Sequence, residues 1–198
     1  MDRPFHSARP DPLARPSPGR RVPALALVLL PLLFGARAAL GAEPAAPASP
    51  APPLFSIPQA ATPLPGVLTS GQPTEEQLAA VARAGYKTVV NLRTAGEPGT
   101  WDEAPKAAEL GLRYVSIPMK GADDLTEANV RALAEVLADP QAYPVVVHCA
   151  TSNRVGALFA LKAFQLDGAS AEEALELGRK AGLKGLEAAV RERLQLKE

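Results

Sequence analysis

One stretch decides the fold of this chain: Val145-Val146-Val147-His148-Cys149-Ala150-Thr151-Ser152-Asn153-Arg154-Val155-Gly156. Three β-branched residues at its start predict a buried strand, and the apolar residues after Arg154 predict a helix. The strand therefore ends at a cysteine, a short polar turn follows, and the first turn of the helix faces back toward the sulfur.

Such a turn has a definite chemistry. The free N–H groups at a helix N-terminus bind anions, and the same partial positive charge stabilises a thiolate. Arg154 adds a planar cation that binds two oxygens of a phosphate-like group at once. The stretch thus predicts a nucleophilic cysteine, Cys149, in an oxyanion-binding loop.

Composition narrows the possible functions. The chain has 198 residues with 47% hydrophobic content, enough for one domain of ordinary size plus extra segments. The formal net charge is zero, which gives no electrostatic reason to expect nucleic acid as a partner. Cys149 is the single cysteine, and the histidines are His6 and His148. These counts exclude an internal disulfide, a Cys/His zinc cluster and a resolving cysteine.

The N-terminal third of the sequence has the pattern of an export signal followed by a linker. Arg20-Arg21 precede an apolar run, residues 22–35, that is too short to span a bilayer comfortably, and Ala36-Arg37-Ala38 offers an A-x-A cleavage site. We predict a cleaved signal over residues 1–42, a Pro/Ala-rich linker over 43–65 and a folded domain over 66–198. The product would be periplasmic or secreted, without stable membrane insertion after cleavage.

Apolar periodicity, capping boxes and turn residues predict alternating elements after Gly66. Strands are expected over residues 67–70, 87–92, 113–117 and 143–148, and helices over 74–83, 102–110, 126–138, 155–166, 170–182 and 183–196. This alternation predicts an α/β domain in three layers, with a central, mostly parallel sheet of about four to five strands flanked by helices. Ligands of such sheets bind at the carboxyl ends of the strands.

His148-Cys149-x4-Arg154 after a hydrophobic strand resembles the signature of the cysteine-dependent phosphatase superfamily. More closely, the chain resembles the phosphatase-like domain of the beta-lactamase-hydrolase-like family, whose members are also labelled sulfur transferases. The resemblance covers about Leu68 to Leu183. The segments that carry it are Thr69–Pro73, Val89–Arg93 with Glu97, Val147–Ala157 and Ala181–Leu183.

The resemblance implies a cysteine-phosphatase-like fold and a role for each matching residue. Cys149 would be the nucleophile, Arg154 the oxyanion clamp, and Asp123 or Asp124 the general acid, although these aspartates also suit the start of a helix at Thr126. No metal or cofactor is implied. The residues expected to bind substrate or shape the loop are His148, Ala150, Thr151, Ser152, Asn153 and Val155.

Three departures from the phosphatase pattern leave the chemistry open. Four residues separate Cys149 from Arg154, where most such phosphatases have five, and four also occurs in rhodanese-type sulfurtransferases. Ser152 replaces the usual loop glycine, which restricts the backbone if φ is positive there. Val155 replaces a hydroxyl that helps the thiolate leave, so turnover would be slow unless Thr151 or Ser152 substitutes.

Three functions therefore remain. The first is a protein-tyrosine or dual-specificity-phosphatase-like hydrolase of phosphate monoesters, acting on a small molecule or a phosphoprotein. The second is a sulfurtransferase that works through a Cys149 persulfide on a sulfur-containing substrate. The third is a non-catalytic anion-binding module, because an exposed thiolate without a resolving cysteine is vulnerable to oxidation. Arg93 and Glu97 are expected to form a structural ion pair, and Trp101-Asp102 to be a false match to a catalytic acid loop.

Overall fold

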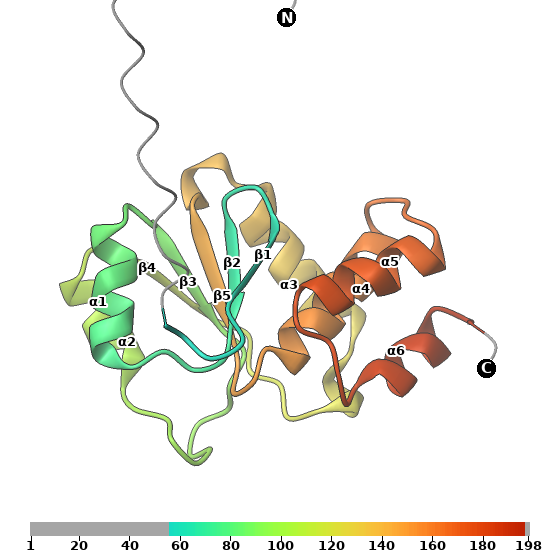
Figure 1. Ribbon diagram of the computed structural model, residues 1–198, viewed down its shortest axis with the longest axis horizontal. Coiled ribbons are helices and arrows are strands. Elements are labelled where there is room, and N and C mark those ends of the chain that lie inside the picture. Colours follow the sequence, from blue (N-terminus) through green and yellow to red (C-terminus); the bar gives the residue numbers. More distant parts are fainter. Residues whose placement is uncertain (1–55, 197–198) are drawn as a thin grey trace, which may run out of the picture. The chain divides into compact units, whose positions relative to one another are not determined.

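A five-stranded sheet in the order β1-β2-β5-β3-β4 forms the centre of the computed structural model, which describes residues 56–196 (Figure 1). β1 runs antiparallel to β2, and the other neighbours are parallel. The expected mostly parallel sheet is therefore confirmed, with one antiparallel edge. The strands are β1 (Ala61–Leu64), β2 (Val67–Ser70), β3 (Thr88–Asn91), β4 (Arg113–Ser116) and β5 (Val145–His148).

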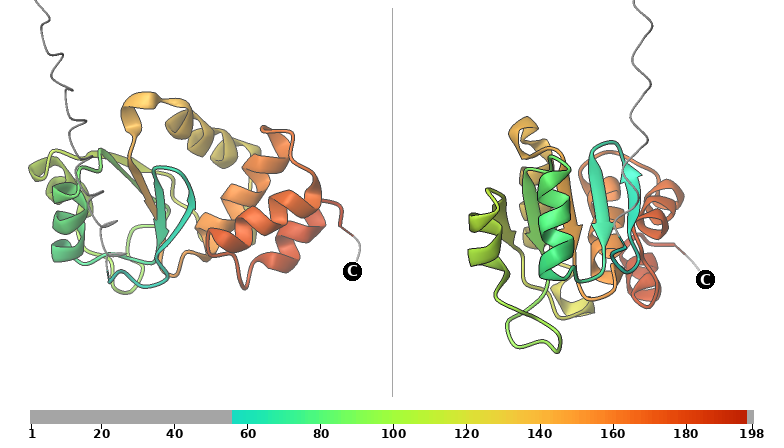
Figure 2. Two further views of the ribbon diagram at one scale, coloured as in Figure 1. Left: turned by 45° about the horizontal axis from the view of Figure 1, so that its top comes forward. Right: turned by 60° about the vertical axis from the view of Figure 1, so that its left-hand side comes forward.

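Helices cover both faces of the sheet, as the predicted layers require (Figures 1 and 2). One face carries α1 (Glu75–Arg83) and α2 (Glu103–Glu109). The other carries α3 (Glu127–Ala138), α4 (Asn153–Gln165), α5 (Ala171–Lys180) and α6 (Glu187–Arg193). Two 3-10 turns, η1 (Ala122–Asp124) and η2 (Pro140–Ala142), flank α3. The capping boxes predicted at Thr74 and Ser170 are both formed.

Successive side chains of β5 point to opposite faces of the sheet, so they pack into separate apolar clusters. Val145 and Val147 pack with α3, α4 and α5, whereas Val146 packs with Val81 of α1. Cys149 belongs to the larger cluster, on the side of α4. Because both faces of the sheet are covered, β5 is a continuous apolar run, which is why its sequence predicts a central strand.

The carboxyl ends of four neighbouring strands lie in one row. His148 of β5 is in register with Ser70 of β2 and with Asn91 of β3, and Asn91 is in register with Ser116 of β4. The segments that follow these residues therefore meet at a single edge of the sheet. This row positions the candidate site.

The boundaries predicted from sequence need three corrections. β1 lies inside the predicted linker, and Ile57 is buried, so the fold begins before Gly66; the Pro/Ala composition of this segment concealed an edge strand. α4 begins at Asn153, two residues earlier than expected. The last predicted helix contracts to α6 because Gly182 and Gly185 lie in the turn before it. The export signal lies outside the described residues.

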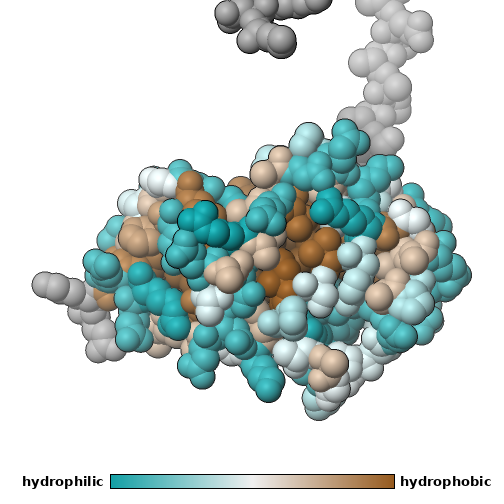
Figure 3. Space-filling model, turned by 180° about the vertical axis from the view of Figure 1, so that it is seen from behind, coloured by the Kyte–Doolittle hydropathy of each residue, from teal (hydrophilic) through white to brown (hydrophobic). Residues whose placement is uncertain are grey.

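The described surface is largely hydrophilic, with apolar side chains gathered near the middle of the rear face (Figure 3). Its exposed large hydrophobic residues are Leu64 and Leu166, each at little more than a third of full exposure. Within residues 56–196, no helix has the length and apolar content needed to cross a membrane.

Close packing of α4 against α5 fixes the base of the cysteine loop. A Cβ atom on Gly156 of α4 would lie 2.2 Å from Leu183 N and 2.6 Å from Gly178 O. Gly178 is similarly restricted, since its Cβ would lie 2.8 Å from the Cβ of Ala160. Only glycine fits at these positions, and α4 is consequently buried along most of its length, as its sequence predicts.

We predict that Gly156→Ala destabilises the protein by about 3 kcal/mol, because the contacts at Gly156 are to backbone atoms that cannot move aside. Urea unfolding followed by circular dichroism measures the effect. Gly185→Ala is the matched control, since the nearest atom to its added Cβ is 3.7 Å away. Equal stabilities of the two variants would contradict the packing account.

Candidate functional site

Cys149 directly follows β5, the strand flanked by β2 and β3, and its N–H donates to Ser70 O over 3.3 Å. Its side chain is fully buried. The loop from Cys149 to Ser152 then leads into α4, whose first N–H groups have no acceptor within the helix. The predicted arrangement of strand, cysteine, turn and helix is therefore present.

The segment after β2 holds the outer side of this loop. Gly71 forms an antiparallel bridge with Thr151, and Gln72 N–H donates to Ala150 O over 3.3 Å. A Cβ on Gly71 would lie 2.9 Å from Ala150 O, so glycine is required for this approach. The Gly71–Pro73 turn thus supports the cysteine loop.

Ser152 has the left-handed conformation, with φ of 62°. A non-glycine residue pays roughly 1–2 kcal/mol for this conformation. The Ser152 hydroxyl offsets part of that cost by donating to Ala181 O over 2.8 Å. Gly182 makes room for it, since a Cβ there would lie 2.5 Å from the Ser152 Cβ. The backbone restriction expected at Ser152 is therefore present, and the hydrogen bond to Ala181 and the space at Gly182 hold the serine in this conformation.

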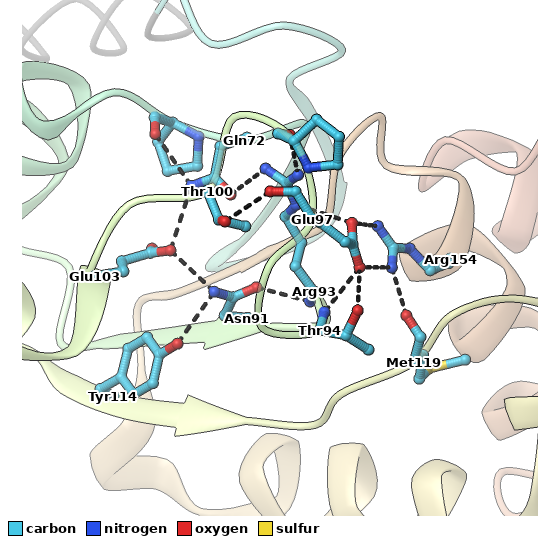
Figure 4. A network of polar contacts seen from close by, with 12 residues as sticks. Gln72, Asn91, Arg93, Thr94, Glu97, Thr100, Glu103, Tyr114, Met119 and Arg154 are labelled. Atoms are coloured by element: carbon cyan, nitrogen blue, oxygen red, sulfur yellow. Dashed lines mark hydrogen bonds and ion pairs between the residues drawn. The ribbon is translucent and has the colours of Figure 1, made fainter.

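Arg154 forms a two-pronged ion pair with Glu97 (Figure 4). Its Nη1 donates to Glu97 Oε1 over 2.6 Å and its Nη2 to Glu97 Oε2 over 2.8 Å, and Nη1 also donates to Met119 O. Chiefly this carboxylate, with a further contribution from the Cys149 sulfur, raises the pKa of Arg154. Hydrogen bonding to Arg154 in turn lowers the pKa of Glu97 well below its usual range. Both charges are therefore held at neutral pH.

The expected ion pair between Arg93 and Glu97 is confirmed, with Nε 3.1 Å from Oε2. Arg93 is almost completely buried, and it also donates to Gln72 Oε1 over 2.8 Å and to Pro98 O over 2.6 Å. Glu97 therefore lies between two arginines. The sequence analysis did not predict the contact between Glu97 and Arg154. Glu97 follows β3 and Arg154 follows β5, and the residues that follow neighbouring parallel strands lie at the same edge of the sheet, which is the signal for this contact.

His148 contacts a buried carboxylate. Its Nε2 lies 2.9 Å from Oε1 of Glu103. The other Glu103 oxygen, Oε2, accepts from Asn91 Nδ2 over 3.1 Å and from Gln72 Nε2 over 3.3 Å. The other imidazole nitrogen, Nδ1, makes no hydrogen bond within the described residues. Glu103 was not foreseen, because it lies in the first turn of a helix, where acidic residues are common.

The two candidate acids differ in their surroundings. Asp124 Oδ2 accepts the Lys120 N–H over 2.6 Å and so braces the loop between β4 and α3. Asp123 is exposed in η1 and makes no side-chain hydrogen bond in the described part of the chain. Asp102 is the residue before α2 and is exposed on the other side of the Thr94–Thr100 loop. Neither Asp123 nor Asp124 lines the pocket that opens beside Arg154.

A pocket of about 470 Å³ opens beside Arg154. Thr151 and Asn153 line it from the loop and α4, whereas Ala150, Ser152, Val155 and Cys149 do not. Val155 is fully buried in the core and its side chain does not line the pocket. The remaining lining residues are Thr94, Ala95, Gly96, Glu97, Pro98, Lys120, Gly121 and Leu186.

Known proteins share this sequence and architecture. Residues 65–190 match a family model described as "DSP-PTPase phosphatase fused to NAD+ Kinase". Beta-lactamase hydrolase-like proteins of Xylella fastidiosa and Agrobacterium fabrum are 36% and 32% identical over 96 residues, which is 46% of this chain and 22% of each relative. The chain therefore matches less than a quarter of those relatives' length.

Solved structures establish the fold as that of cysteine phosphatases. A Shewanella putrefaciens protein of the DUF442 group superposes with a TM-score of 0.54 and 23% identity, covering 69% of this chain and 88% of that one. P. aeruginosa TpbA, solved in complex with pTyr, superposes with a TM-score of 0.51 and 22% identity, covering 65% and 78%. The expected cysteine-phosphatase-like fold is confirmed.

We predict that Glu97→Gln makes the free energy of unfolding less dependent on pH between pH 7 and pH 3. The lowered pKa of Glu97 means that its pairing stabilises the protein above the unfolded-state pKa of about 4.3 and is lost as the pH falls toward the folded-state value. The difference in unfolding free energy between wild type and variant should therefore be largest at pH 7 and shrink below about pH 4.

Urea titrations at several pH values measure this difference, and Glu109→Gln, a change at an exposed residue of α2, serves as control. A difference that stays constant from pH 7 to pH 3 would show that the charge of Glu97 does not stabilise the fold.

Proposed function

The chain belongs to the DSP-PTPase phosphatase family that its residues 65–190 match, and we propose that it is a cysteine-dependent phosphatase of phosphate monoesters. One observation carries the proposal. Cys149 follows the central strand and precedes the N-terminus of α4. Arg154 lines an open pocket, and the Cys149 sulfur helps to raise the pKa of Arg154. This combination suits a thiolate nucleophile beside an oxyanion site.

In the proposed reaction, the Cys149 thiolate attacks phosphorus, a P–S bond forms, and the P–O bond to the leaving group breaks. The N–H groups at the start of α4 and the Arg154 guanidinium stabilise the equatorial oxygens. Water then attacks the phosphocysteine, the P–S bond breaks, and inorganic phosphate leaves. Glu97 is a positioning residue in this scheme, because it fixes the plane of the guanidinium without contacting the reacting atoms.

The leaving oxygen needs a proton, and we assign its donor to Asp123. Asp124 is engaged with the Lys120 N–H, whereas Asp123 lies in the same 3-10 turn, after the loop that follows β4, and is exposed. Asp123 lies close in sequence to Lys120 and Gly121, which line the pocket, and catalytic hydrogen bonds often tighten only once substrate is bound.

Two other functions have a specific observation in their favour. The four-residue spacing from Cys149 to Arg154 favours sulfur transfer through a persulfide. The complete burial of Cys149 favours an anion-binding module without turnover. The assays below separate all three. Because residues 1–42 have the pattern of an export signal, we also propose that the enzyme acts in the periplasm or after secretion.

We predict that Cys149→Ser abolishes hydrolysis of p-nitrophenyl phosphate, with a loss of at least about 1000-fold, because the hydroxyl cannot replace the thiolate. Release of p-nitrophenol measures it. The same two proteins are tested for sulfur transfer from thiosulfate to cyanide, with mass spectrometry of Cys149. A stable persulfide with sulfur transfer would replace the phosphatase proposal, and phosphate binding without either activity would establish the anion-binding module.

We predict that Asp123→Asn lowers kcat for an alkyl phosphate by about 100-fold, because an alkoxide leaves poorly without a proton donor. The loss should be smaller for p-nitrophenyl phosphate, whose leaving group is stable as an anion. Asp124→Asn is the matched variant, and we expect it to lower thermal stability by loosening the Lys120 loop. A larger leaving-group dependence in Asp124→Asn than in Asp123→Asn would reassign the acid.

A further inference from the structure

The charges of the pocket are not all engaged within the protein. Both terminal nitrogens of Arg154 donate to Glu97, the carboxylate that lines the same pocket. Lys120 lines the same pocket and is exposed, and its ammonium makes no ion pair within residues 56–196. Lys120 is therefore the lining cation that has no carboxylate partner within residues 56–196.

The loop that carries Lys120 is braced on both sides. The Lys120 N–H donates to the Asp124 carboxylate over 2.6 Å, and the Asn129 side chain donates to Asp124 O over 2.8 Å. From α6, Arg193 donates to Ala122 O over 2.8 Å and to Leu125 O over 3.3 Å. The backbone at Lys120 is thus fixed, so a ligand there pays ordering entropy for the side chain alone.

We infer that Lys120 binds a second phosphate group of the substrate, on the side of the leaving group. The inference rests on the proposed function and assigns a substrate class to it: diphosphates, and phosphate esters whose alcohol bears another phosphate. Lys120 comes from the β4–α3 loop, whereas the N–H groups of the α4 N-terminus and Arg154 supply the donors for the phosphate being transferred. The pocket, at about 470 Å³, exceeds what one phosphate occupies.

Binding of two inorganic anions to the full chain tests this assignment without requiring turnover. Calorimetry measures the dissociation constants of inorganic phosphate and inorganic pyrophosphate for Cys149→Ser, which keeps the loop but removes the nucleophile. The same measurement is made with Lys120→Met and with Lys184→Met added to that background. Lys184 is the matched control because it is exposed near the rim, beside Leu186, but does not line the pocket.

We expect Lys120→Met to weaken pyrophosphate binding about tenfold while phosphate binding changes less than about twofold, and Lys184→Met to leave both nearly unchanged. Equal weakening of both anions by Lys120→Met would overturn the inference, since Lys120 would then serve the transferred phosphate. Equal effects of the two lysines would also overturn it, because only general attraction would remain. If neither anion binds Cys149→Ser, the proposed function fails together with the inference.

Discussion

The ion pair between Arg154 and Glu97 is the interaction on which the candidate site depends. An arginine in an oxyanion site must be held in one plane, because a flexible guanidinium would lose much of its advantage as a two-pronged donor. Glu97 holds it with both carboxylate oxygens, and Met119 O accepts from the same guanidinium. The pair is largely buried, so removal of one partner would leave the other charge poorly solvated.

Glu97 itself is fixed by the segment in which it lies. Thr94 N–H donates to Glu97 Oε1 over 2.8 Å, and the Thr94 hydroxyl lies 3.0 Å from the same oxygen. Arg93 then ties Glu97 to Gln72, whose backbone contacts the cysteine loop. One network (Figure 4) therefore joins the ends of β2, β3 and β5, and the pocket is shaped by contacts among loops that are distant in sequence.

The cysteine loop has a second support on the side of the helices. Ser152 is held by Ala181, and Asn153 Oδ1 accepts the N–H groups of Lys184 and Leu186 over 2.8 Å and 3.2 Å. Close packing of α4 on α5 brings this turn within reach. The loop is thus clamped between the Gly71–Pro73 turn and the α5–α6 turn, which suits a site whose donors must be arranged before the substrate arrives.

The sequence by itself determined the layers of the fold and the position of the cysteine loop, because the apolar run of β5, the alternation of strands and helices and the two capping boxes are local patterns. It also indicated Cys149, Arg154 and the Arg93–Glu97 pair. Tertiary structure alone decided that Glu97 holds Arg154, that Glu103 contacts His148, and that Val155 is buried in the core. Those facts depend on which strand ends are neighbours and on which face of a helix packs inward. Local patterns do not specify either one.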